Sequence, residues 1–156
     1  MKKFKFALDT VLAYKEQVLE ALQGEHAAIL ARVHAQEDLI DGLYRQYQEY
    51  NDEYRQRAGE GMPITEALMY QNGLRAAEME IQRETQRLEK LRAQEEKKRA
   101  EVVEAKKDTS SIEKLKEKKL DAYNKAVEKS EEQFIEEFVN TARINAANAA
   151  NAAAMA

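Results

Sequence analysis

The heptad pattern between Leu8 and Tyr54 constrains the fold of this chain more than any other feature. Alternating steps of four and three residues from Leu8 visit fourteen positions, and eleven of them are apolar or aromatic. Because this spacing averages about 3.5 residues per turn, the apolar side chains form one narrow seam along an α-helix that packs against a partner helix. The three polar seam positions, Lys15, His26 and Gln36, are of the kind that fixes the register and the number of partners.

A break rich in glycine predicts that the partner helix lies in the same chain. Residues 58–63 read Ala-Gly-Glu-Gly-Met-Pro. Gly59 suits the left-handed residue after a helix, and Pro63 suits the first turn of the next helix. A connection this short returns the second helix antiparallel to the first. A weaker heptad seam from Ala67 to Ile112 supplies the facing side. We therefore predict an all-α antiparallel coiled-coil hairpin with helix 1 at about 4–57, a turn at about 58–63 and helix 2 at about 64–144.

The second helix is predicted to be longer than the first and to overhang it. If the turn centres near residue 61, Tyr54 faces residues near 68 and Leu8 faces residues near 113. Residues beyond about 115 then lack a partner within the chain, although their sequence stays amphipathic. Such a stripe implies an external partner, self-association or local disorder. We predict one coiled-coil rod over residues 1–144, followed by a low-complexity Asn/Ala tail over 145–156.

Composition excludes several classes of protein. The chain is 35% charged and has one proline, and its mean hydropathy is −0.75, which is typical of long solvated helices rather than a compact core. No apolar run approaches the roughly 18 residues of a membrane span, so we expect no membrane insertion. The absence of cysteine is compatible with the cytoplasm.

No pattern in the sequence predicts catalysis, a cofactor or a metal. There is no Gly-rich phosphate loop and no Ser/His/Asp arrangement, and His26 and His34 lie too far apart along a helix to share one metal ion. Carboxylates on a two-helix rod face water, where nothing tunes them for acid–base work. We expect no enzyme activity. Lysines gather between residues 97 and 119, but the net charge of −4 favours an acidic protein partner over nucleic acid.

Three stretches of the chain resemble one family. The first is the start, Phe4-x-Phe6-x-Leu8-x-x-Val11-Leu12, and the second is the pair Tyr50–Arg55 and Tyr70-Gln71 on either side of the turn. The third is a charged second helix that ends in Phe134-x-x-x-Phe138. Together they resemble the flagellar export protein FliJ family of the flagellar type III secretion system, over most of residues 4–144.

The resemblance implies a stalk similar to the gamma subunit of rotary ATPases. Such a stalk sits in a hexameric export ATPase, touches the export gate protein FlhA with its tip and binds export chaperones. It would be cytoplasmic and peripheral to the membrane-embedded export apparatus. The implied gate contact at the tip consists of Tyr47, Tyr50, Tyr54, Tyr70, Leu74 and Ala77. The implied ATPase contact at the helix ends consists of Phe4, Phe6, Tyr123, Val127, Phe134 and Phe138. Gly73 stands where this family more often shows an aromatic residue.

Other interpretations stay open beside this one. The chain can be a passive coiled-coil scaffold or a holdase-like chaperone that self-associates through its C-terminal overhang, or a parallel homodimer with a cytoskeletal role. The tyrosines near the turn can serve seam packing alone, or a surface that is both apolar and wet. As a stalk, the protein is expected to be a monomer when isolated.

Overall fold

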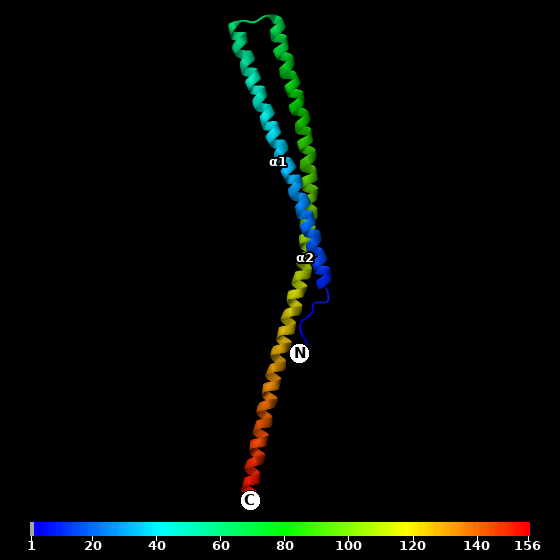
Figure 1. The fold of residues 1–156 in the computed structure, drawn as a ribbon, viewed down its shortest axis with the longest axis vertical. Helices are drawn as coiled ribbons and strands as arrows, with labels where there is room; N and C mark the ends of the chain where they lie inside the picture. Colours follow the sequence, from blue (N-terminus) through cyan, green and yellow to red (C-terminus); the bar gives the residue numbers. More distant parts are fainter. Residues whose placement is uncertain (1) are drawn as a thin grey trace. The chain divides into compact units, whose positions relative to one another are not determined.

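The computed structural model describes residues 2–156, which form two helices joined by a short turn (Figure 1). Helix α1 spans Asp9–Glu60 and helix α2 spans Ile64–Met155. The residue with left-handed backbone is Gly61, with φ of 94°, rather than Gly59 as the sequence predicted. Glycine adopts this conformation without a steric cost, so α1 can run to Glu60 before the chain reverses. The predicted hairpin with a longer second helix is confirmed.

The chain divides into two units, and the first comprises residues 16–107. In this unit α1 and α2 run antiparallel and enclose the apolar seam that the heptads predict. Its core includes a cluster of Val33, Ile40 and Leu88, with Leu91 packed against them. Burial of such side chains from both helices removes apolar area from water, which stabilises the pairing.

Polar seam residues of α1 meet polar partners on α2 within this unit. The imidazole Nε2 of His26 lies 2.8 Å from Oε1 of Glu95. The side-chain amide of Gln36 donates to the Glu84 carboxylate at 2.6 Å and to the Glu84 carbonyl at 3.0 Å. Both glutamates are buried, so these partners satisfy groups that water does not reach freely. The two polar layers therefore specify one register of the helices.

The second unit comprises residues 2–15 and 108–156, and its N-terminal segment is not helical. The Phe4 ring lies 5.5 Å from the ring of Tyr123, whose hydroxyl donates to the Lys2 carbonyl at 2.8 Å. Phe6 is buried, and α1 begins at Asp9, not near residue 4 as predicted. The physical reason is reach, because an extended residue advances about 3.3 Å where a helical one advances about 1.5 Å. A few extended residues thus cover several turns of α2.

Because this extended segment packs on α2, the uncovered part of α2 begins later in the sequence than predicted. The sequence predicted loss of the partner beyond about residue 115, but Tyr123 and Val127 are still half-buried and every residue from 128 onward is exposed. Helix 2 was predicted to end at about residue 144, yet α2 continues through the Asn/Ala tail to Met155. Alanine is the strongest helix former, so this stretch stays helical without packing. Within residues 2–156, neither helix has a stretch apolar enough to cross a membrane.

Candidate functional site

Three tyrosines near the turn pack against one another. The Tyr70 ring lies 5.0 Å from that of Tyr50 and 5.4 Å from that of Tyr54. The Tyr70 hydroxyl donates to Glu53 at 3.0 Å, and the Gln71 amide donates to the Tyr54 hydroxyl at 3.3 Å. Tyr70 is only 7% exposed, whereas Tyr50 and Tyr54 are half-buried. The cluster therefore combines a packing residue with two tyrosines that still present surface.

Gly73 is what allows Tyr50 to lie so close to α2. A Cβ atom at this position would fall 2.7 Å from both the ring edge and the hydroxyl of Tyr50, well inside van der Waals contact. The side chain of Tyr50 thus occupies the space that any other residue at position 73 would fill. Gly73 is an unusual residue in the sequence at this position, but only the geometry connects it to Tyr50.

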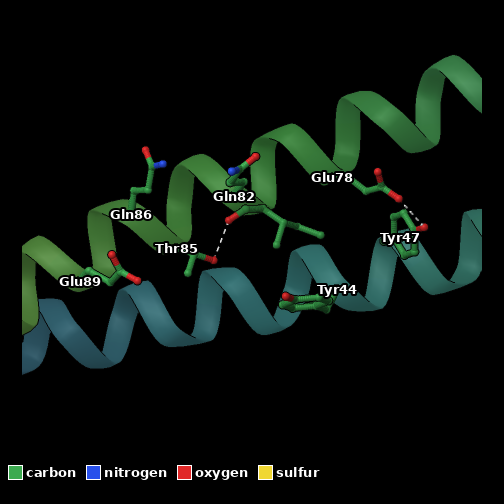
Figure 2. Close-up of a pocket in the computed structure, with 8 residues that line it drawn as sticks. Tyr44, Tyr47, Glu78, Gln82, Thr85, Gln86 and Glu89 are labelled. Carbon is green, nitrogen blue, oxygen red and sulfur yellow. Dashed lines mark hydrogen bonds between the residues drawn. The ribbon is translucent and has the colours of Figure 1, made fainter.

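Tyr47 stands between two grooves on opposite faces of the hairpin. The smaller groove, of 310 Å³, is lined by Leu43, Gln46, Tyr47, Tyr50, Gly73, Ala77 and Glu80. The larger groove, of 610 Å³, is lined by Tyr44, Tyr47, Glu78, Ile81, Gln82, Thr85, Gln86 and Glu89 (Figure 2). Residues that are two positions apart in sequence are separated by about 200° around a helix. Tyr44 and Gln46 therefore point to opposite sides of α1. The same separation holds for Glu78 and Glu80 on α2.

The predicted gate residues are only partly brought together by these grooves. Tyr47, Tyr50 and Ala77 line the smaller groove, whereas Tyr54, Tyr70 and Leu74 do not. Leu74 is half-buried, and Tyr70 supports Tyr50 and Tyr54 through ring contacts.

One hydrogen bond fixes Tyr47 at the boundary of the two grooves. Its hydroxyl donates to the Glu78 carboxylate at 2.9 Å. This bond raises the pKa of Tyr47 above its ordinary value of 10, because the phenolate would face a carboxylate and lose the bond. Tyr47 therefore keeps its proton at neutral pH and acts as a donor.

Exposed apolar residues near the turn were missed by the sequence analysis. Ile64 is 79% exposed, Met69 is 71% exposed, and Leu68 and Met79 are also largely exposed. They lie off the heptad seam, so a search for seam residues passes over them. The signal that identifies them is an apolar side chain at a position the heptads assign to solvent.

The six predicted helix-end residues fall into two groups. Phe4, Phe6, Tyr123 and Val127 are at least half-buried within their unit. Phe134 and Phe138, one turn apart, are 69% and 68% exposed. The surrounding residues, 128–144, contain five glutamates against Lys129 and Arg143, so the exposed aromatic stripe has an acidic setting.

The arrangement of these residues suits binding. Among residues 2–156, no three acidic or histidine side chains gather closely enough to hold a metal ion.

In a comparison with protein families, the model described as "Flagellar FliJ protein" matches residues 4–148. No match was found among curated proteins or among solved structures.

Proposed function

We propose a linking role for this chain, which belongs to the flagellar FliJ family and is a component of flagellar protein export. In this proposal it links the hexameric export ATPase to the export gate protein FlhA. In this role it inserts into the ATPase ring as a stalk and escorts export chaperones. It acts in the cytoplasm, at the periphery of the membrane-embedded export apparatus.

The observation that supports the proposal is that the chain exposes aromatic residues in two regions, as a protein with two binding partners would. One is the set of half-exposed tyrosines beside the turn, and the other is the uncovered pair Phe134 and Phe138. A linker needs two such surfaces, and a single-purpose coiled coil needs only its seam. A hairpin of two unequal helices also lacks sixfold symmetry, so it would make the six ATPase subunits inequivalent and promote ordered turnover.

The ATPase contact is assigned to the helix ends. Phe134 and Phe138 supply its free apolar surface, and Phe4, Phe6, Tyr123 and Val127 hold the N-terminal segment beside it. Since residues 128–144 carry an excess of glutamates, the receiving surface on the ATPase is expected to be apolar with a basic rim.

The gate contact is assigned to the smaller groove and its surroundings. Tyr47, Tyr50, Tyr54 and Ala77 form the contact surface, with Tyr70 and Leu74 beneath it. Tyrosine suits this role because its ring buries apolar area while its hydroxyl stays hydrated.

Purified export ATPase provides the test. Its activity and hexamer content are measured with and without this protein, and the wild-type chain should raise both. The double variant Phe134→Asp/Phe138→Asp should abolish the effect, while Tyr50→Ala/Tyr54→Ala should retain it and lose binding to FlhA. If the wild-type chain changes neither activity nor hexamer content, the stalk role is wrong.

A second candidate, a self-associating scaffold or holdase-like chaperone, is favoured by the same uncovered stripe. If Phe134 and Phe138 form a dimer seam, light scattering will give twice the chain mass of 17.9 kDa, and Phe134→Asp will return it to a monomer. If the stalk role holds, the wild-type chain is already a monomer.

A further inference from the structure

The larger groove of the hairpin lies on the face that the proposed gate contact does not use. Apart from Tyr47, none of its lining residues belongs to the predicted gate set. It is about twice the volume of the groove on the other face, 610 against 310 Å³. Its character can therefore be considered separately from gate binding.

The groove offers apolar surface at Ile81 and Tyr44, and the hydroxyls of Tyr47 and Thr85 beside them already have partners. Ile81 is buried at its base, and Tyr44, which is 51% exposed, forms one wall. The Thr85 hydroxyl donates to the Ile81 carbonyl at 2.7 Å, and the Tyr47 hydroxyl donates to Glu78 (Figure 2). An occupant thus needs to satisfy few polar atoms at the base and can bury apolar area there.

The dimensions of the groove fit an α-helix. On α2 it extends from Glu78 to Glu89, which is about 16 Å or three helical turns. A furrow between two antiparallel helices accepts a third helix, whose side chains at three- and four-residue spacing enter it. An extended peptide would find no sheet edge to pair with, because the described chain consists of helices and short connections.

The charge around the groove selects the kind of helix. Glu78 and Glu89 line it, and Asp41 lies one turn before Tyr44 on the same side of α1. Within residues 2–156 none of these three carboxylates has a cationic partner within 4.0 Å. The neighbouring Glu37 is neutralised by Arg92 at 3.2 Å. The rim is therefore acidic and fits a cationic partner.

A second copy of this chain is a poor occupant. Its uncovered apolar stripe, around Phe134 and Phe138, is surrounded by an excess of glutamates. Placing that stripe in the groove would bring like charges together, and juxtaposed like charges disfavour association.

We propose that this groove binds an amphipathic helix of a partner protein that carries Lys or Arg along both edges of its apolar stripe. The groove is a docking site in addition to the gate and ATPase contacts. It does not depend on either of them.

The test uses the full chain and a defined probe, a fluorescein-labelled amphipathic Leu/Lys peptide of about 14 residues, long enough to fill the groove as a helix. Fluorescence anisotropy gives its affinity for the wild-type chain and for Asp41→Lys/Glu89→Lys. The matched control, Glu49→Lys/Glu104→Lys, changes the net charge equally but alters exposed residues outside both grooves. We expect the groove variant to weaken binding roughly tenfold and the control to change it less than about twofold.

Two tyrosine substitutions provide a second test in which the net charge of the protein does not change. Tyr44→Ala should weaken peptide binding, while Tyr14→Ala, an equally simple truncation of an exposed tyrosine of α1, should not. All six altered side chains are exposed, and circular dichroism checks that the helices remain.

Several outcomes would overturn the proposal. Equal losses in the two charge-reversed variants would mean general attraction to an acidic protein. Equal binding of a Leu/Glu peptide with the same pattern would remove the argument from charge. Binding lost in Phe134→Asp but retained in the groove variant would place the peptide on the uncovered stripe. A wild-type dimer that Asp41→Lys/Glu89→Lys converts to a monomer would identify a second copy as the occupant.

Discussion

Tyr70 and Phe138 are aromatic residues of the same helix, yet 7% of Tyr70 is exposed against 68% of Phe138. Both belong to the apolar stripe of α2. The difference is that α1 covers the first, whereas nothing within residues 2–156 covers the second. A periodic apolar stripe therefore predicts a face that needs a partner, and the length of the other segments decides whether that partner is internal.

The two regions also treat polar side chains differently. In the covered seam, Gln36 and His26 have partners on the facing helix, and those partners are buried glutamates. In residues 128–144 every polar side chain faces water and needs no partner. The covered region thus depends on specific pairs, and the uncovered region depends on helix propensity alone.

Truncating one aromatic residue in each region should give the largest contrast. Tyr70→Ala should lower the free energy of unfolding by about 2–4 kcal/mol, because it removes a buried ring from the packing of Tyr50 and Tyr54. Phe138→Ala should change it by less than about 0.5 kcal/mol, because its ring is solvated. Urea unfolding followed by circular dichroism measures both. Similar losses would show that residues 128–144 pack on something.

Removing a polar side chain from the seam should have the next largest effect. Gln36→Ala should cost about 1–3 kcal/mol, since the buried Glu84 loses its partner across the seam. Gln133→Ala, in the uncovered region, should be close to neutral. The double variant Gln36→Leu/Glu84→Leu should recover most of the loss, because two apolar residues replace the pair. If the double variant is as unstable as the single one, the loss does not come from the contact that the Glu84 carboxylate makes with Gln36.

Acid should weaken the covered region through Glu95. The hydrogen bond with His26, and then that with Arg99, hold the pKa of Glu95 below its ordinary value of 4.5 despite burial. A carboxyl with a lowered folded pKa contributes stability that is present above 4.5 and is lost as the pH falls toward the folded pKa. The midpoint temperature of thermal unfolding should therefore fall less steeply between pH 6 and pH 3 in Glu95→Gln than in the wild-type chain. Glu132→Gln should follow the wild-type curve.

Two glycine substitutions should give the smallest difference. Gly24→Ala should stabilise the protein by roughly 0.5–1 kcal/mol, because a Cβ there meets nothing within 4 Å and alanine favours the helix. Gly73→Ala should lose most of this gain, because the Tyr50 ring has to move. Urea midpoints give the stabilities, and tyrosine fluorescence reports the displaced ring. Equal gains at both positions would mean that Tyr50 moves at no cost.

Much of the fold could be predicted because hairpin geometry follows from counting. The seam, the glycine-containing turn and the facing of Tyr54 with residues near 68 all come from spacing, and Tyr54 packs on Tyr70. The resemblance to the FliJ family is likewise confirmed by the match over residues 4–148. These features are local or periodic, so they can be predicted from the spacing of residues in the sequence.

The remainder depends on contacts that no spacing rule contains. Heptads indicate that Gln36 and His26 lie in the seam, but not which buried glutamate each will meet. The start of α1 was placed too early, because the packing of the Phe4 ring on Tyr123 from a non-helical segment does not show in the spacing of apolar residues. The fit of Tyr50 onto Gly73 depends on a side-chain rotamer. The two grooves arise from side-chain volumes on both helices together.

The polar layers of the hairpin have a mechanical consequence. A slide of α2 by one heptad would place Gln36 against Leu91 or Ala77, and His26 against Val102 or Leu88, depending on direction. Either slide strands buried polar groups on apolar neighbours, so slipped alignments are disfavoured at both layers at once. A pull along one helix of this unit is therefore opposed by both layers together. No alignment shifted by one heptad restores the lost hydrogen bonds. Residues 16–107 therefore resist axial sliding of one helix along the other.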